Sequence, residues 1–595
     1  MFLRATTRKK DGKTHRYWSV VENVRTKSRR VVQRHVLYLG EINDAQRAAW
    51  CRSIEVLEAG RTRPVPMAIF PEDRPAPELD CTVVRVRLDE IRLERPRQWG
   101  ACWLALTVWG WLELDDFWAP RLGCSREGTD WLNVLKTLTV YRLIDPGSEW
   151  RLHRQWFERS AMGDLLGEGL ALVQPSTLYR CLDKLVAHKP ALFAFLKQRW
   201  AGLFGASFEV LLYDLTSTYF ESDPPPPEGL RRFGYSRDHR PDCVQVVIAL
   251  IVTPEGFPLA YEVMSGNTAD KTTLEAFVQQ IEAQYGKAER IWVMDRGIPT
   301  EEVLEKLRQS SPPVRYLVGT PRGRLTALEQ DFVSRPWEQA REAVQVKLLE
   351  QAGELYILAR SAGRVDKERA IRRRKLKRLM KRLGELQSQP LTPKELLMKL
   401  GAAKKEAGHA WRLVNLELPA LDQGRQRQSF RFSLDRSKLR DVRRREGHYL
   451  LRSNLAGAPP AQLWAFYIQL TEVEQAFKEL KSDLSIRPIY HQKDRRIEAH
   501  IFVAFLAYCL HVTLKAQLHL LASGLTPRAV LEQLAGMQMV DVHLPTTDGR
   551  HLLLRRYTEP TAEQRLLLAH LKLALPKQAA PKISSAANSA AAPAV

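Results

Sequence analysis

A series of short apolar segments between residues 208 and 320 constrains the fold of this chain more than any other feature. Each segment has the length and hydrophobic pattern of a strand or a helix, and turn residues separate the segments. In chain order they are the strands FEVLLYDL, CVQVVIALIV and FPLAYEVM, the helix DKTTLEAFVQQIEAQYG, the strand RIWVMDRG, the helix PTEEVLEKLRQ and the strand VRYLVGT. Strands interleaved with crossover helices form a mixed sheet, so the sequence predicts an α/β class.

Composition and local pattern divide the chain before this core. A basic β-ribbon is predicted over 1–60, from the strands Arg16–Val21 and Val31–Leu39. It either lies on DNA or forms an exposed hairpin with solvated charges. A linker region, rich in Pro and Arg at its start, is expected over 61–98. Residues 99–205 are predicted to be helical and form a candidate DNA-binding domain.

One segment of this helical region has two interpretations. The stretch PSTLYRCLDKLVAHK offers Ser176 as an N-cap and predicts a short basic helix. It is either the second helix of a helix-turn-helix pair or a helix that packs in the core. The packing helix is favoured, because the tight turn that a helix-turn-helix needs is not evident before it.

A long insertion interrupts the α/β core before its last helices. It contains the run RVDKERAIRRRKLKRLMKRL and alternating apolar stretches, which predict a partly β subdomain with a basic helical arm. A long buried helix is predicted from Ile497 to about Leu521. The expected parts are a core over 206–325 and 456–523, an inserted subdomain over 326–455, a helical annex over 524–577 and a disordered Ala-, Pro- and Ser-rich tail over 578–595.

The charge of the chain indicates a polyanionic partner. The formal net charge is +23, which fits nucleic acid, although anionic membranes attract basic proteins too. The apolar stretch Ile501–Leu510 is too short and too polar at its ends to span a bilayer, so no membrane partner is expected. No secretory signal opens the chain, and the seven cysteines form no CxxC pair. The cytoplasm is therefore the expected compartment.

Two aspartates mark the ends of predicted strands. Asp214 closes the run LLYD, and Asp295 closes the run WVMD. Ligand sites of open α/β sheets form at the ends of strands, although an aspartate there also caps turns. Carboxylate oxygens suit hard divalent metals, which place several carboxylates and substrate phosphates around the ion.

A third carboxylate lies on a predicted late helix, Tyr467–Lys481, with the sequence YIQLTEVEQAFKELK. Tyr467, Glu474 and Lys481 follow one another at seven-residue intervals, which is about two helical turns, so they are expected to share one face. Phe477 is expected to seat this helix against the core. On its own the segment also fits an ordinary amphipathic helix with solvated charges.

Together, these segments resemble the ribonuclease H-like catalytic core of DDE transposases. More narrowly, they are similar to bacterial transposases of the insertion-sequence-four superfamily, through LLYDLTSTYFE, VMDRG and the late helix. The signature of that superfamily is Tyr, two residues, Arg, three residues, Glu, six residues and Lys, which matches Tyr467, Glu474 and Lys481. Leu470 stands where the family usually has Arg, and Lys478 is a candidate replacement for that charge.

The resemblance implies a function. It implies that Asp214, Asp295 and Glu474 are the catalytic metal ligands and hold Mg²⁺ or Mn²⁺, as two ions. Tyr467, Lys481 and Lys478 are then expected to bind DNA. The enzyme would bind the terminal inverted repeats of its mobile element, nick the ends and join the 3′-hydroxyl to target DNA. A homodimer on paired ends, associated with the bacterial nucleoid, is expected from the resemblance alone.

Other acids and other functions compete with this hypothesis. Glu472 is predicted to point about 200° away from Glu474 around the helix. Asp238 and Asp242 are expected to pair with Arg237 or Arg240. No histidine spacing indicates zinc, and no phosphate-binding loop supports nucleotide hydrolysis. The alternatives are a catalytically silent, transposase-derived DNA-binding regulator and a structure-selective nuclease on the same fold.

Overall fold

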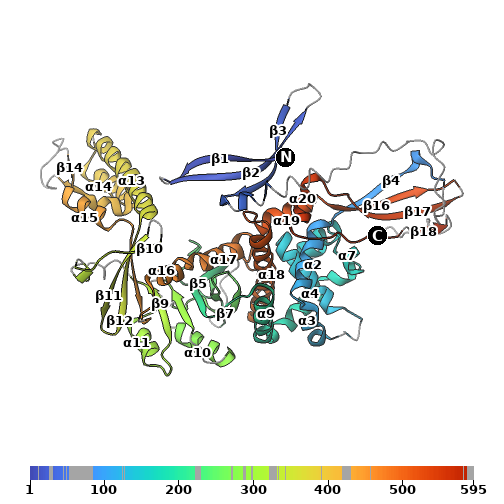
Figure 1. The fold of residues 1–595 in the computed structure, drawn as a ribbon, viewed down its shortest axis with the longest axis horizontal. Helices are drawn as coiled ribbons and strands as arrows, with labels where there is room; N and C mark the ends of the chain where they lie inside the picture. The colour runs from blue at the N-terminus through green and yellow to red at the C-terminus, as the bar shows by residue number, and fades with distance from the viewer. Residues whose placement is uncertain are drawn as a thin grey trace. The chain divides into compact units, whose positions relative to one another are not determined.

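A computed structural model gives the fold of the chain (Figure 1). It describes residues 1–10, 13–25, 31–44, 46–48, 50–51, 85–123, 125, 128–221, 229–269, 273–285, 290–295, 299–320, 328, 331–332, 334–341, 344–389, 391–418, 430–455, 457–547, 549–580 and 582–585. The chain forms two compact units. The first unit contains Met1–Thr6, Tyr17–Ala288 and Thr471–Val595, and the second contains Thr7–Arg16 and Glu289–Leu470.

The N-terminal segment forms a sheet with the strand order β1-β2-β3. The strands are β1 (Phe2–Lys10), β2 (Lys13–Arg25) and β3 (Val31–Gly40), and β2 pairs with β3 in the antiparallel sense. The sequence indicated only the second and third strands. The basic residues of β1 hid its alternating pattern, because Arg and Lys occupy several of its positions. Most of the expected linker, residues 61–84, lies outside the described residues.

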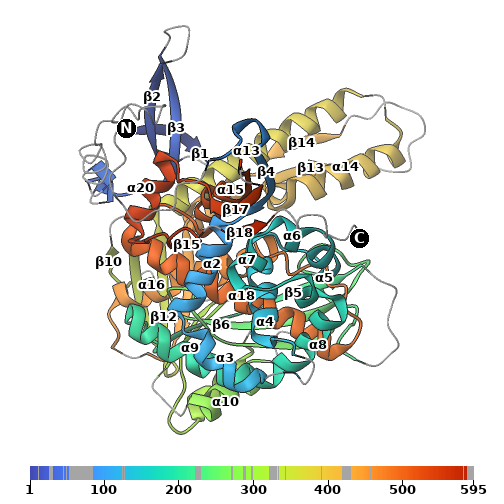
Figure 2. The same ribbon diagram turned by 90° about the vertical axis from the view of Figure 1, so that its right-hand side faces the viewer.

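Helices surround α18 (Asp494–Leu521) in the first unit (Figure 2). The helices α2 (Gly100–Trp111), α4 (Trp131–Ile144), α8 (Pro175–Leu185) and α9 (Lys189–Phe204) all contact it. Although α18 is long and apolar enough to cross a membrane, 94% of its most apolar window is buried inside the protein. The buried helix predicted from the sequence is therefore confirmed.

The helix α8 packs in this core and starts one residue before its predicted cap. Pro175 is its first residue, and Gln174 rather than Ser176 occupies the N-cap position. Leu178, Cys181 and Leu182 are buried, and α8 contacts both α4 and α18. These contacts favour the packing interpretation over the helix-turn-helix interpretation.

Three antiparallel strands carry the first predicted aspartate. They are β5 (Val210–Phe220), β6 (Val244–Val252) and β7 (Pro258–Ser265), and β6 and β7 form an antiparallel hairpin. The strand β5 continues past Asp214 to Phe220, so the prediction that Asp214 ends its strand is wrong. The run TSTYF after Asp214 is rich in β-branched and aromatic residues, which extend the strand.

Helices cover both faces of these three strands. On one face, Tyr213 packs on Phe277 of α10 (Leu274–Tyr285), with ring centroids 5.6 Å apart. On the other face, Tyr261 stacks on Phe505 of α18, with centroids 4.0 Å apart. The observed architecture of the first unit is thus a mixed α/β arrangement with a sheet between helices.

The second unit contains six strands of a mixed sheet. The strands β10 (Glu338–Arg341), β11 (Val344–Gln351), β12 (Glu354–Ser361), β15 (His448–Ser453), β9 (Arg315–Gly319) and β8 (Ile291–Met294) are hydrogen-bonded in that order. Only β8 and β9 in this set are parallel, and α11 (Glu301–Gln309) connects them. The predicted strand, helix and strand between residues 290 and 320 are therefore present.

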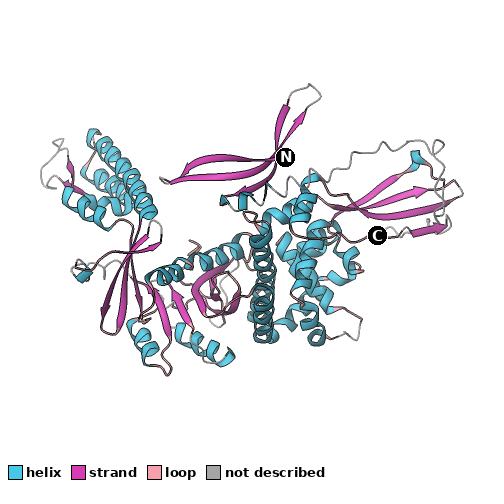
Figure 3. Cartoon of the chain, in the orientation of Figure 1, coloured by secondary structure: helices cyan, strands magenta, loops and turns pink. Residues whose placement is uncertain are grey.

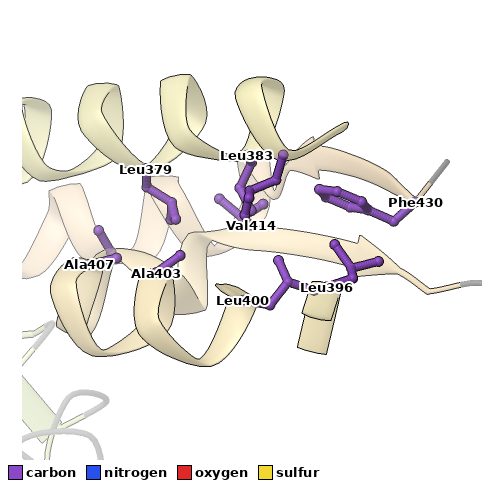
Figure 4. Packing of buried hydrophobic residues seen from close by; sticks show 10 residues of the cluster. Leu379, Leu383, Leu396, Leu400, Ala403, Ala407, Val414 and Phe430 are labelled. Carbon is purple, nitrogen blue, oxygen red and sulfur yellow. The ribbon is translucent and has the colours of Figure 1, made fainter. Parts of the chain in front are cut away.

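The predicted basic arm is a pair of long helices with a small core. The helix α13 (Ala362–Ser388) packs on α14 (Pro393–Ala407), and β13 (Val414–Glu417) pairs with β14 (Arg431–Leu434) beside them. Leucines from both helices pack against Val414 and Phe430 (Figure 4). The helix α15 (Arg436–Arg445) follows β14, and all these elements belong to the second unit.

The C-terminal part of the first unit contains a sheet that the sequence did not predict. The strands are ordered β18-β17-β16-β4, from Lys582–Ser585, Arg550–Tyr557, Gln538–Pro545 and Arg92–Gln98 (Figure 3). The expected helical annex over 524–577 is correct only for α19 (Pro527–Ala535) and α20 (Ala562–His570). The strand β4 comes from the expected linker, and β18 comes from the expected tail. Residues 586–595 of that tail lie outside the described residues.

Candidate catalytic site

Asp214 lies on the face of its sheet that α18 covers. Its Cα partner across the strands is Leu250, and the partner of Leu250 is Tyr261. Side chains directly opposite each other in antiparallel strands share a face. Because Tyr261 stacks on Phe505 of α18, the Asp214 side chain also points to that layer. The carboxylate is half-buried, and its Oδ1 accepts a hydrogen bond of 2.7 Å from the Leu215 amide.

Side-chain contacts join the helix α17 (Leu470–Ser482) to the same α18. Lys515 of α18 pairs with Glu472 at 3.1 Å, and His511 lies 3.4 Å from Glu479. Glu472 and Glu479 therefore mark the side of α17 that rests on α18. Phe477 is buried, as predicted.

Glu474 lies on a different side of α17 from the residues that contact α18. It is exposed, whereas Glu472 is half-buried in its ion pair with Lys515. The expectation that these two acids point in different directions is confirmed. Glu474 is consequently the acid of this helix that can reach a ligand outside the core.

The other expected DNA-binding residues have different surroundings. Lys478 is exposed on α17. Tyr467 is half-buried and packs on Tyr449 and Trp464, with ring centroids 5.9 and 6.2 Å away. Leu470, which replaces the arginine of the family signature, is buried.

The predicted single helix over Tyr467–Lys481 is interrupted. The helix α16 (Pro460–Ile468) ends at Ile468, and α17 begins at Leu470. Tyr467 belongs to the second unit, whereas Glu474 and Lys481 belong to the first. The prediction of one continuous helix is therefore wrong, because Gln469 forms a turn between the two segments.

Lys481 pairs with an acid inside the first unit. Its Nζ lies 2.7 Å from Asp238 Oδ1, and Arg487 also contacts that oxygen. Burial lowers the pKa of Lys481, and the hydrogen bond to Asp238 opposes this shift. Asp238 was expected to pair with Arg237 or Arg240, whereas the structure pairs it with Lys481 and Arg487. The expected Arg240–Asp242 pair is confirmed at 2.9 Å.

Asp295 belongs to the second unit, where it directly follows β8 and is exposed. Its predicted place at the end of a strand is confirmed. The structure therefore brings Asp214 and Glu474 onto two elements that both pack on α18, and it places Asp295 at a strand end of the other unit.

The donor set fits a hard divalent ion. All three predicted ligands offer carboxylate oxygens, which Mg²⁺ and Mn²⁺ prefer. Asp295 and Glu474 are exposed and Asp214 is half-buried, so ligand oxygens are accessible rather than sealed in the core.

A buried cluster that the sequence did not predict lies elsewhere in the first unit. Glu149, His491 and His500 place one potential ligand atom each within 4.8 Å of one another. His491 Nε2 lies 3.2 Å from Glu149 Oε1. Burial raises the pKa of Glu149, but interactions with both histidines hold it well below its ordinary value. Glu149 is too far from the histidines in the chain for any local spacing to indicate the cluster.

This cluster does not fit a metal ion, because it already contains a cation. Arg142 Nη2 lies 3.5 Å from His500 Nδ1, the nitrogen that lies 3.9 Å from Glu149 Oε1. Burial, together with the charge of Arg142, lowers the pKa of His500 to about 4. Glu149 is thus a buried carboxylate whose charge is balanced by Arg142 and by hydrogen bonds.

Comparison with known proteins identifies the family of the α/β core. A sequence model of the family described as "Transposase DDE domain" matches residues 207–510. That match covers more than half of the chain, so the protein belongs to this family and is a transposase. A second model, described as "IS1634 family transposase, N-terminal domain", matches residues 3–61. The protein is therefore a transposase of the insertion-sequence type.

Two further comparisons add no functional conclusion. A search of curated proteins gives no match. A solved structure entitled "Cryo-EM structure of piggyBac transposase synaptic complex with hairpin DNA (SNHP)" is similar over 73% of this chain and 76% of that chain. Its sequence identity is 9% and its TM-score is 0.33, values too low to support a conclusion about this chain.

Proposed function

We propose that this transposase binds the terminal inverted repeats of its own mobile element, nicks the element ends and joins the freed 3′-hydroxyl to target DNA. The core would be ribonuclease H-like, of the insertion-sequence-four type. The observation that carries the proposal is the orientation of α17, which presents Glu474 while Lys515 and His511 hold Glu472 and Glu479. The match of the DDE family over residues 207–510 supports the same assignment.

Asp214, Asp295 and Glu474 are the proposed catalytic residues and metal ligands. When bound, Mg²⁺ or Mn²⁺, as two ions, supplies a water of lowered pKa and neutralises charge on the phosphate. The three carboxylates hold the ions and orient the scissile phosphate. Phosphoryl transfer depends on positioning and charge neutralisation more than on covalent catalysis, which suits a site built from acids alone.

Basic residues supply the proposed DNA contacts. Lys478 is exposed on the same helix as Glu474, where it can neutralise a phosphate near the site. The family signature predicts that Tyr467 and Lys481 bind DNA. Of these two we retain Tyr467, because the Lys481 ammonium is engaged by Asp238. The net charge of +23 supports a nucleic-acid partner for the whole chain. We infer two copies, one for each element end, acting in the cytoplasm on the nucleoid.

Plasmid nicking tests this function. A supercoiled plasmid that carries the inverted repeats flanking the reading frame is incubated with the full chain and Mg²⁺. The wild type should convert it to a nicked form, and Asp214→Ala, Asp295→Ala and Glu474→Ala should each prevent this while end binding persists. Binding of the ends by the wild type without nicking would favour the DNA-binding regulator. Nicking at DNA structures without regard to the repeats would favour the nuclease.

A further inference from the structure

Asp238 is a buried carboxylate with two cations on one of its oxygens. Lys481 Nζ lies 2.7 Å from Asp238 Oδ1, and Arg487 contacts the same atom. The Asp238 side chain is only 5% exposed. Its second oxygen, Oδ2, is buried and has no hydrogen-bond partner among the described residues. A carboxylate in this setting is held in place by its two cations rather than by solvent.

The backbone around Asp238 is fixed to the strand that carries Asp214. The amide of Arg237 donates a hydrogen bond of 3.2 Å to Ser217 Oγ, and Ser217 is a buried residue of β5. The amide of Arg240 donates to Ser236 Oγ at 3.0 Å, which closes the turn. His239 has a φ of 58°, in the left-handed region that costs energy for a residue with a side chain. The turn is therefore held in a strained conformation that its contacts maintain.

The cations of Asp238 come from the helix that carries Glu474 and from the loop after it. Lys481 lies seven residues after Glu474 on α17, which is about two turns along the same face. Arg487 follows α17, and its loop is tied to β5 because the Ile489 amide donates to the Tyr219 carbonyl at 3.2 Å. Asp238 thus joins the strand of one proposed metal ligand to the helix of another.

We propose that Asp238 is a positioning residue that sets the separation of Asp214 and Glu474 through its contacts with Lys481 and Arg487. This inference rests on the proposed function, since it assigns Asp238 to the catalytic machinery through the two acids. Removal of the carboxylate leaves two facing cations, Lys481 and Arg487, without a counter-ion. Their repulsion moves the end of α17 away from β5, and Glu474 moves with it.

The same geometry gives Lys481 a structural rather than a DNA-binding role. Its side chain is 14% exposed and its ammonium is engaged by Asp238. Lys478, three residues earlier on α17, is exposed and is the better placed of the two lysines for a phosphate. Lys481 acts on the reaction through Asp238 and the position of α17.

The contacts of Asp238 with Lys481 and Arg487 could stabilise the fold alone or could also position Glu474. These two roles lead to different expected results. Loss of a purely stabilising pair lowers the free energy of unfolding and leaves the metal requirement of the folded enzyme unchanged. Loss of a positioning pair separates two metal ligands, so more Mg²⁺ is needed for the same rate. The two roles are therefore separable in folded protein by a magnesium titration.

The test uses Asp238→Asn, which removes the charge and keeps the shape, with Asp242→Asn as the matched control. Asp242 lies in the same turn, is also ion-paired, and has a side chain that is 62% exposed. Nicking of the inverted-repeat plasmid is measured across Mg²⁺ concentrations, end binding is measured separately, and hydrogen exchange is followed over residues 470–482. A misplacement of this kind costs on the order of 10- to 100-fold in rate.

Asp238→Asn should need a roughly tenfold higher Mg²⁺ concentration for the same nicking rate. Its affinity for the DNA ends should stay within about twofold of the wild-type affinity, and its amide hydrogens in α17 should exchange faster. Asp242→Asn should match the wild type. Lys481→Gln should behave like Asp238→Asn, and the double variant should be no worse than either, because the two residues act as one unit. If Asp238→Asn does not fold, Asp238→Glu, which keeps the charge but shifts it, must show the same altered metal requirement.

Two results overturn the inference. The first is that folded Asp238→Asn protein, or Asp238→Glu protein in its place, keeps the wild-type magnesium requirement and the wild-type hydrogen exchange in α17. The other is Lys481→Gln protein that loses end binding while its magnesium requirement stays normal. In both cases the wild type still nicks, so the proposed function survives. A wild type that never nicks the plasmid rejects the proposed function and this inference together.

Discussion

Glu472 of α17 and Lys515 of α18 form an ion pair of 3.1 Å, which fixes the rotation of α17 about its own axis. Residues two positions apart on a helix point about 200° from each other, so the pair turns Glu474 away from α18. The distinction between these neighbouring acids leads directly to a matched pair of variants.

Glu474→Ala should lower the rate of plasmid nicking by at least about a hundredfold, the scale on which one preorganised charge-stabilising group contributes. Glu472→Ala should retain most of the rate, because its carboxylate only pairs with Lys515. The measurement is the nicked fraction against time at saturating Mg²⁺. Full activity in Glu474→Ala, together with loss of activity in Glu472→Ala, would show that the wrong acid of α17 has been assigned.

DNA affinity should fall steeply with salt, and exposed cations of the arm should contribute to that slope. Arg373, Lys375 and Lys377 of α13 are exposed. Their simultaneous replacement by Gln should make the slope of log affinity against log salt shallower by about 2 to 3, at roughly 0.9 for each phosphate that is no longer neutralised. The measurement is end binding across a salt series. An unchanged slope would identify these residues as solvated charges on the arm.

Arg372, in the same basic run, should affect stability rather than DNA binding. Its guanidinium is buried and pairs with Glu446 at 2.5 Å. Arg372→Ala leaves the buried Glu446 carboxylate with only the longer contact of 3.8 Å to Arg369 among the described residues and should destabilise the arm by about 3 kcal/mol. The control is Arg378→Ala, since that side chain is 77% exposed and its pair with Glu406 is worth about 0–1 kcal/mol. Hydrogen exchange over residues 362–407 measures both, and equal effects would contradict the prediction.

The buried His500 should make the first unit sensitive to acid. Burial lowers its pKa from 6.5 to about 4, so the folded protein binds this proton less readily than the unfolded chain. Stability is then complete above pH 6.5 and is lost as the pH falls from 6.5 toward 4, by up to about 1.4 kcal/mol per unit. Arg142, Glu149 and His491 face the ring, and protonation of Glu149 adds a loss in the same direction at lower pH.

Urea unfolding at pH 7 and pH 5 measures this sensitivity. His500→Asn should reduce the difference in stability between the two pH values, while His519→Asn should not. His519 is an exposed histidine of the same helix and serves as the control. An unchanged pH dependence in His500→Asn would contradict the assigned shift.

The α/β core was predictable because its signals are local. Apolar runs of strand length and the turn TPEG between two of them each specify structure within a few residues. The apolar length of α18 likewise predicts a buried helix. Asp295 was placed correctly for the same reason, since an apolar strand of four residues ends immediately before it.

Features that depend on distant partners were not predictable. The sheet of β4, β16, β17 and β18 joins strands from both ends of the chain. The partner of Lys481 is Asp238, far away in the sequence, so no local spacing indicates the pair. Arg372 was indistinguishable from its exposed neighbours until Glu446 was placed beside it.

Joining of a precut DNA end distinguishes a transposase from a DNA-binding regulator and from a nuclease. The substrate is a duplex with the inverted-repeat sequence that flanks this reading frame, cut to expose the 3′-hydroxyl, and a plasmid serves as target. The full chain with Mg²⁺ should covalently join the duplex to the plasmid, whereas protein without the metal, or with Glu474→Ala, should bind the duplex and join nothing. Wild-type protein that binds or nicks the DNA in Mg²⁺ and Mn²⁺ but never forms the joined product would contradict the proposed function.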